Sequence, residues 1–334
     1  MGSDPGAASG PKVPNPRGSF SERLFAAMRD PYAPLPQMQP DDADDLQISL
    51  WALYELHYRG LRGVREDLEW SPELLERRAA LESVFENGLR TLTGPLLEEC
   101  AGTGSIVERL SQIVSHDDEV PSLPSFVHRT ATASQYREFL KQRSIYHLKE
   151  SDPQAFTLPR LSGRPKVALA ELQYDEFGAG VPAQLHSEMF ARALSAAGLD
   201  STYGAYVDEA SAEVLAVNNA MSLFGLHRRL RGASMGHLAA FEMTSSFPSR
   251  RYAMGAERLG FDSEVVGYFD EHVEADAVHE QIAARGICQE LVRMEPELAD
   301  DIAFGAASCV LLDSEASRVL MDSWAASSAH QVAI

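Results

Sequence analysis

Helical spacing of apolar residues is the feature that most constrains this chain. From Asp41 onward, apolar residues recur at steps of three and four, as in SPELLERRAALESVFENGLRTL. Runs that alternate apolar and polar residues around hairpin turns are missing from the sequence, and so are repeats of solenoid length. The sequence therefore predicts an all-α protein.

Changes in composition divide the chain into three predicted parts. Residues 1–40 are rich in Pro, Gly and Ser and indicate a disordered or extended arm. Residues 41–130 are predicted to form an N-terminal helical subdomain, which begins with acids that suit a helix N-terminus. Prolines in PSLPSFVHRTATASQ mark the junction to the main domain, residues 131–334, whose first helix Thr132 or Ser134 is expected to cap.

The acidic balance excludes several kinds of partner. The formal net charge is −20, from 29 Lys and Arg against 49 Asp and Glu, and it would repel phosphate backbones and anionic headgroups. We therefore expect neither nucleic acid nor membrane as a partner. The sequence has no apolar run of bilayer length and no secretory h-region at its start, which predicts a cytoplasmic location. Its three cysteines make no CxxC pair, so we interpret them as reduced thiols.

The sharpest local signal for chemistry is the segment FDEHVEADAVHEQ. Its His272, Asp276 and His279 stand at positions i, i+4 and i+7, within about 60° of one another around a helix. One face would then carry two imidazoles and a carboxylate, a donor mixture that suits divalent metals such as ferrous iron. The alternative is a solvated acidic helix whose polar residues bind nothing.

A second candidate pair flanks the segment FGAGVPAQL. Glu176 and His186 would be nearly three turns apart in an unbroken helix, too far to share a metal. Two glycines and a proline between them allow a break that brings the side chains together. An ordinary turn between two helices is the alternative interpretation.

Two further carboxylates are candidate ligands. Glu242 lies among apolar and small residues in AAFEMTSS, where an ionised carboxylate needs a partner such as a metal. Glu150 ends the YHLKE helix, where the helix dipole disfavours an acid. For each of the two, a salt-bridged or surface carboxylate is the simpler explanation when it is considered singly.

Two polar pairs are candidates for the surroundings of a site. Arg250 and Arg251 could hold a substrate carboxylate through two parallel hydrogen bonds, or could form surface ion pairs. Asn218 and Asn219 interrupt the apolar run AVNNAM, so they could line a pocket or bond across helices.

Several other site types lack their motifs. A ferritin-like diiron bundle needs ExxH pairs, and the chain's single acidic-x-x-His is Asp276 to His279. Cysteine-based zinc sites and the P-loop and GxGxxG signatures are missing. Seven donors are also too many for a mononuclear zinc hydrolase, which needs three ligands and an open position.

Residues from about 135 to 300 resemble the haem-oxygenase-like diiron oxidases and oxygenases, also described as iron-containing redox enzymes. The segments that carry the resemblance are ELQYDEFGAG with LHSEMF, NNAMSLFGLHRRLRGASMGHLAAFEMTSS, RRYAMGAERLG and EHVEADAVHEQ. The resemblance implies a haem-oxygenase-like bundle with an extra N-terminal subdomain. In relatives this subdomain serves dimerisation, so we expect a homodimer.

The resemblance also implies a ligand set. One iron would be held by Glu176, His186, Glu242 and His272, and the other by Glu150, Asp276 and His279, with Glu176 bridging.

The resemblance further implies an activity: two Fe(II) ions with O2 as co-substrate and electrons from an external donor. The expected reaction is N-oxygenation, by way of a peroxo-diferric species, of an amine or guanidine nitrogen. Its product would be a hydroxylamine and, on repetition, a nitroso or nitro group. The expected substrate is a small, nitrogenous, amino-acid-derived metabolite of natural-product biosynthesis.

Two other functions remain open from the sequence. The same site could serve a diiron oxidative decarboxylase, desaturase or C–C lyase that acts on an amino or fatty acid. A helical protein that binds metal without turning over is the alternative from a different class. Manganese, or a mixed iron–manganese pair, would take similar ligands.

Overall fold

The computed structural model describes residues 10–30, 32–102, 104–116 and 122–332, and for 274–277 and 328–332 it describes the backbone alone. These residues form helices and no β-strand, which confirms the all-α prediction. The α-helices are α1 Ser19–Arg29, α2 Ala43–Glu55, α3 Pro72–Glu99, α4 Ile106–Val114, α5 Leu123–Arg129, α6 Ala133–His147, α7 Asp152–Ala155, α8 Gly163–Glu176, α9 His186–Ala196, α10 Ala212–Leu226, α11 Arg231–Leu259, α12 Ser263–Gln281, α13 Glu290–Met294 and α14 Ala299–Val332. A π-helix, η7 Ile282–Gln289, joins α12 to α13.

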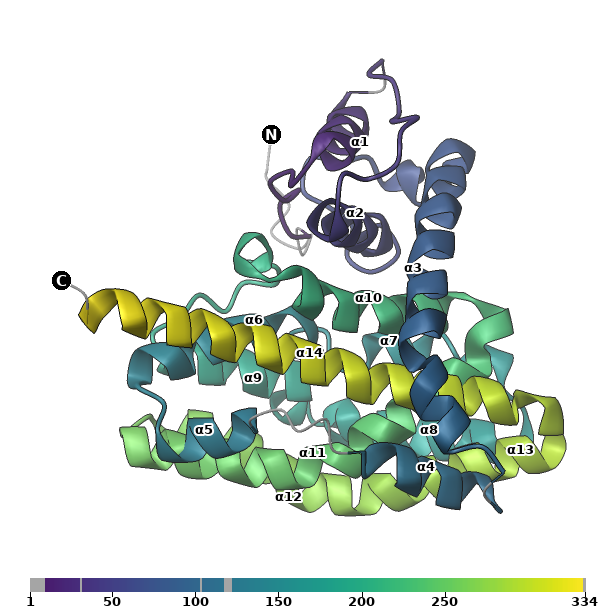
Figure 1. Ribbon diagram of the computed structural model, residues 1–334, viewed down its shortest axis with the longest axis vertical. Coiled ribbons are helices and arrows are strands. Elements are labelled where there is room, and N and C mark those ends of the chain that lie inside the picture. The colour runs from purple at the N-terminus through teal and green to yellow at the C-terminus, as the bar shows by residue number, and fades with distance from the viewer. Residues whose placement is uncertain (1–9, 31, 103, 117–121, 333–334) are drawn as a thin grey trace.

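Three long helices form the centre of the bundle. Helix α11 packs along both α12 and α14, and α3 crosses α14 while α1 and α2 stack above them (Figure 1). Phe139, Phe190 and Tyr268 belong to a buried apolar cluster between α6, α9 and α12. Tyr268 of this cluster contacts Glu150, one of the candidate ligands.

Two glycines permit the close approach of α11 and α14. A Cβ atom at Gly236 would lie 1.8 Å from the carbonyl oxygen of Ile302, and one at Gly305 would lie 1.9 Å from that of Ala233. Neither backbone carbonyl can move far inside a packed bundle, so any larger residue would force the helices apart. This contact fixes α11, which carries Glu242, against the long C-terminal helix.

The capping prediction for α6 is confirmed. Thr132 accepts a hydrogen bond from the backbone N–H of Gln135, whose side chain in turn accepts one from the Thr132 backbone. This reciprocal capping box satisfies two N–H groups that the first turn leaves without partners. It fixes the start of the helix that leads to Glu150.

The N-terminal segment differs from its prediction. Residues 1–9 lie outside the described part of the chain, but residues 19–29 form helix α1 instead of an extended arm. Phe20, Leu24, Phe25 and Met28 share one buried face of this helix. The flanking prolines and glycines obscured that short amphipathic pattern.

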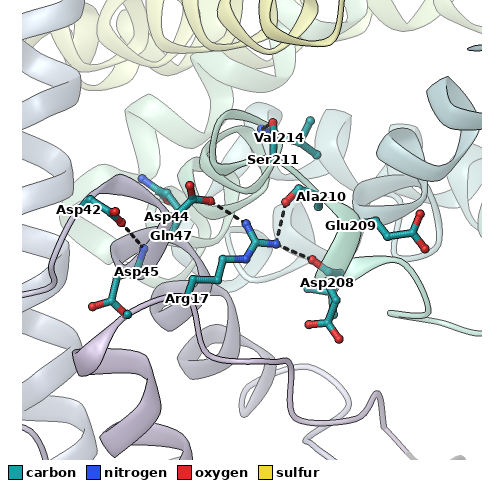
Figure 2. A network of polar contacts seen from close by, with 12 residues as sticks. Arg17, Asp42, Asp44, Asp45, Gln47, Asp208, Glu209, Ala210, Ser211 and Val214 are labelled. Atoms are coloured by element: carbon teal, nitrogen blue, oxygen red, sulfur yellow. Dashed lines mark hydrogen bonds and ion pairs between the residues drawn. The ribbon is translucent and has the colours of Figure 1, made fainter. Parts of the chain in front are cut away.

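An arginine holds this segment against the bundle. Arg17 Nη1 donates to Asp44 Oδ1 at 2.9 Å, and its Nη2 donates to the carbonyl oxygens of Val207 and Ala210 at 2.9 and 2.7 Å. Figure 2 shows the guanidinium between α2 and the turn that precedes α10. The segment is therefore bound to two separate parts of the fold.

The packing does not mark a boundary at residue 130. Helix α4 packs on α14 and η7, and α5 packs on α11, so both contact the main helices directly. The predicted subdomain boundary and the predicted homodimer stay predictions. Among the described helices, none is long and apolar enough to cross a membrane.

Candidate metal centre

A chain reversal brings Glu176 and His186 together. Glu176 ends α8 and His186 begins α9, and between them Gly178, Ala179 and Gly180 all have positive φ angles. A Cβ atom at Gly178 would lie 2.5 Å from the backbone nitrogen of Leu185, so the reversal requires glycine there. As a result, His186 Nδ1 lies 3.3 Å from Glu176 Oε2, as the predicted helix break requires.

Glu150 lies on the turn that follows α6. The next residue, Ser151, has a left-handed backbone with φ of +68°, which is uncommon for a residue other than glycine. Gln173 of α8 donates to both the carbonyl oxygen and the hydroxyl of Ser151. The turn is thus held in one conformation, with the Glu150 side chain buried.

Helices α11 and α12 supply the remaining candidates. Glu242 lies on α11, and His272 and His279 lie on α12, all three with buried side chains. The Asp276 side chain lies outside the described residues, so its predicted role as a ligand stays a prediction. The π-helix η7 begins three residues after His279, and such irregular turns are frequent at functional sites.

Six candidate residues form two groups of possible metal ligands. Within each group the ligand atoms all lie within 4.8 Å of one another. Group 1 contains Glu150, His186 and His272, and group 2 contains Glu176, Glu242 and His279.

This grouping differs from the ligand assignment that the resemblance implied, because Glu150 and Glu242 exchange places. Helices α11 and α12 are joined by a short connection, and Glu242 and His279 lie at nearly equal numbers of residues from it. In an antiparallel pair of helices, residues equally far from the connection lie side by side. Glu150 contacts Tyr268, one turn before His272, and so belongs with that histidine.

Glu176 lies between the two groups. Its Oε2 is 3.3 Å from His186 Nδ1 of group 1, and its Oε1 is 3.3 Å from His279 Nδ1 of group 2. His279 Nδ1 also lies 3.7 Å from Glu242 Oε2. One carboxylate thus contacts donors of both groups, which is the geometry that a bridging ligand needs.

Opposite charges determine the protonation of these groups before any metal binds. Burial raises the pKa of Glu176, but hydrogen bonds from His186 and His279 outweigh it and bring the pKa to about 2. Burial lowers the pKa of His279, but Glu176 and Glu242 outweigh it and bring the pKa to about 11. A divalent metal would replace the protons on such imidazoles, because metal ligands must be deprotonated.

Two further side chains orient group 1. Tyr268 donates its hydroxyl hydrogen to Glu150 Oε2 at 2.8 Å, and His147 Nδ1 lies 2.9 Å from Glu150 Oε1. His272 Nδ1 lies 2.7 Å from the Tyr268 carbonyl oxygen, a contact that places the proton on Nδ1 and directs Nε2 toward Glu150. We did not single out Tyr268 or His147 in the sequence, although Tyr268 lies four residues before His272 and His147 three before Glu150.

The donor set fits iron. Three carboxylates and three imidazoles, all buried, lie in two adjacent groups. Mixed nitrogen and oxygen donors of this kind suit ferrous ions, and buried carboxylates need a cation to be tolerated. The residues present can therefore hold two metal ions side by side.

A cavity adjoins group 1. It encloses about 580 Å³ with its mouth included, and His272, Tyr268 and His147 lie in its wall. The same wall carries Arg143 and Asp313, which form an ion pair with Nη1 and Oδ1 3.2 Å apart. Sequence analysis did not single out either of these charged residues.

The predicted substrate-binding arginines lie elsewhere. Arg250 is exposed, and Arg251 donates to the Ser125 hydroxyl while its guanidinium lies over the Phe247 ring. Neither lines the cavity beside group 1. Their role in substrate binding stays a prediction that these contacts do not favour.

The two asparagines of AVNNAM differ in what they contact: one bonds across helices, and the other lines a cavity. Asn219 Nδ2 donates to the backbone and side-chain oxygens of Gln47, each at 2.8 Å, and so bonds across helices. Asn218 Nδ2 donates to the Ile145 carbonyl oxygen, and its side chain lines a second cavity.

Fold and site together define an all-α protein with a paired carboxylate–imidazole centre. The sequence profile of the iron-containing redox enzymes matches residues 137–314, more than half of the chain. The chain therefore belongs to the family of iron-containing redox enzymes, which confirms the resemblance at the level of the family. No curated protein matches the chain significantly.

Proposed function

We propose that this protein is a non-haem diiron monooxygenase that hydroxylates an amine or guanidine nitrogen of a small, amino-acid-derived substrate. The observation that carries the proposal is the pair of adjacent donor groups between which Glu176 lies. Two ions held so close can each supply one electron to the same O2 molecule.

The proposed reaction balances as RNH2 + O2 + 2e⁻ + 2H⁺ → RNHOH + H2O, where an external donor supplies the electrons. Glu150, His186 and His272 would hold one iron, and Glu242 and His279 the other, with Glu176 shared. Bound ferrous iron would supply an affinity for O2, and a means of passing the donor's electrons to it, that no side chain has. Tyr268 and His147 would keep Glu150 in place.

The adjoining cavity would position the substrate. Arg143 and Asp313 present a cation and an anion side by side, which suits the carboxylate and ammonium groups of an amino acid. Phe241 and Phe269 contribute apolar walls that exclude water. A substrate held by this charged pair could place the nitrogen to be oxidised toward His272.

The choice of nitrogen as the oxidised atom rests on a finer resemblance. The spacing of the candidate ligands is similar to that of the N-oxygenase part of the streptozotocin N-nitrosourea synthase. A nitrogen lone pair is also more easily oxidised than an unactivated C–H bond. Repeated turnover would convert the hydroxylamine into a nitroso or nitro product.

Isotopic oxygen tests the proposed reaction. Iron-loaded protein is incubated with ¹⁸O2, a reductant and a panel of L-arginine, L-lysine and their N-methyl derivatives, and the products are analysed by mass spectrometry. We expect a product that has gained one ¹⁸O atom on nitrogen. Unlabelled product with release of CO2 or an alkene would instead identify a decarboxylase or C–C lyase. O2 uptake no faster than that of Glu176→Ala would identify a metal-binding protein without catalysis.

The substrate-binding role of Arg143 has its own test. We expect Arg143→Met to raise KM about 10- to 100-fold with little change in kcat. The lost charge-assisted hydrogen bonds would stabilise the bound substrate and the transition state equally. Steady-state kinetics on the substrate found above measures both constants. Arg250→Met and Arg251→Met are the matched controls and should keep the wild-type KM. A raised KM in these two variants alone would restore the prediction from the sequence.

A further inference from the structure

A second cavity is lined by the same Arg143–Asp313 pair. It encloses about 650 Å³ with its mouth included, between α6, α10, α11 and α14. Arg143, His147, Phe241 and Asp313 line both this cavity and the one beside group 1. The two cavities are therefore neighbours that share this part of their walls, beside the charged pair.

The wall of the second cavity is mainly apolar. Its lining includes Ile145, Val217, Met221 and Leu320, of which all but Val217 are buried. Arg143 and Asp313, by contrast, keep 23% and 49% of their side-chain surface exposed. The charged pair is thus the more exposed part of the lining, and these apolar residues are the more buried part.

Two buried polar side chains in this lining have no hydrogen-bond partner for some of their polar atoms. His237 and Asn218 are each 1% exposed. Neither ring nitrogen of His237 has a hydrogen-bond partner among the described residues, and neither does Asn218 Oδ1. Both residues line the cavity. Buried polar atoms without partners are rare in native proteins, because each loses its hydrogen bonds to water.

The chemistry of these two side chains defines what they can bind. Burial lowers the pKa of His237 to about 4, so its ring is neutral near pH 7 and offers one N–H donor and one nitrogen acceptor. Asn218 Oδ1 is an acceptor whose amide nitrogen is already used by Ile145. A matching ligand group therefore carries N–H donors and a carbonyl acceptor and has no net charge.

We propose that the second cavity binds an uncharged amide-type group, carried on a short apolar chain, as the distal part of the substrate. This inference rests on the proposed function, since it extends the substrate beyond the part held by Arg143 and Asp313. A charged group would be poorly placed there, because neither His237 nor Asn218 carries a charge to oppose it. The substrate would thus be longer than a single unmodified amino acid.

Binding of hexanamide to iron-free protein tests the inference. Hexanamide has the required amide on an apolar chain, and 2-heptanone is a ketone of similar size without N–H donors. By isothermal titration calorimetry we expect hexanamide to bind at least about tenfold more tightly than 2-heptanone, because the ketone leaves Asn218 Oδ1 without a donor. His237→Phe and Asn218→Leu should each weaken hexanamide at least about fivefold. His237→Gln should restore part of the loss.

Met221→Leu is the matched control, because it keeps an apolar side chain of similar volume in the same wall and should leave binding unchanged. Equal affinities for hexanamide and 2-heptanone in the wild type would overturn the inference even if a variant failed to fold. So would hexanamide binding that the His237 and Asn218 substitutions leave intact. The measurement uses no iron and no O2, so its outcome is separate from that of the labelling experiment.

Discussion

Replacing Glu176 by alanine is expected to remove most of the bound iron. Glu176 contacts His186 through one carboxylate oxygen and His279 through the other, so its loss removes a donor from both groups at once. We expect the affinity for iron to fall at least about 100-fold, since weaker second-sphere changes already cost 10- to 100-fold. Anaerobic reconstitution followed by metal analysis and Mössbauer spectroscopy measures the bound iron.

Substitutions confined to one group should have a smaller effect. Glu242→Ala and His279→Ala affect group 2, and His272→Ala affects group 1. We expect each of the three to retain about one iron per chain, where the wild type binds about two. Glu257→Ala is the control, because this glutamate lies on the same helix as Glu242 but is exposed. Iron content untouched in the Glu176 and His279 variants would show that these residues are not ligands.

The residues on one helix were the easiest part of the site to predict. His272 and His279 share a stripe of α12, because a fixed rotation per residue makes the face of a helix readable from spacing alone. Glu176 and His186 needed one further step, the helix break at Gly178. The allocation of Glu150 and Glu242 to the two groups depends on which residues of neighbouring helices lie side by side in the bundle. Spacing within a single helix does not contain that information.

The surroundings of the site were harder to predict for a related reason. Arg143, Asp313 and His237 lie on three different helices and converge only after the bundle has packed. Each of them alone resembles an ordinary surface charge or core histidine. The predicted role of Arg250 and Arg251 came from their adjacency in the sequence, and it stays a prediction that their positions on α11 do not favour.

Local signals were reliable where they had a local cause. The cap of α6 satisfies backbone groups next to it in the sequence, and the acids at the start of α2 lie at a helix N-terminus, as both were expected. Helix α1 was missed because four apolar residues between prolines leave too short a pattern to detect. Its stability comes from the core that it shares with α2, which is a tertiary contact.

Replacing Lys149 by methionine is expected to lower the free energy of unfolding by about 3–5 kcal/mol, the usual cost of removing one partner of a buried ion pair. Lys149 Nζ lies 2.7 Å from Glu55 Oε1, and the side chains are 1% and 0% exposed. In Lys149→Met, Glu55 would keep only its hydrogen bonds from the Tyr203 hydroxyl. Urea denaturation followed by circular dichroism measures the change. Lys141→Met is the control: its pair with Glu209 has a similar length of 2.8 Å but is solvent-exposed, so the loss should be at most about 1 kcal/mol.

The same pair connects the N-terminal helices to the metal centre. Glu55 ends α2, and Lys149 directly precedes Glu150. If the pair fixes the Glu150 turn, Lys149→Met should weaken iron binding about 10- to 100-fold, as second-sphere changes do. The double variant Glu55→Leu/Lys149→Met removes both buried charges and should recover most of the stability. The iron affinity of this double variant separates two ways in which α2 could position the Glu150 turn. Recovered affinity would mean that packing alone positions the turn. Weak iron binding in a stable protein would mean that the ion pair itself does so.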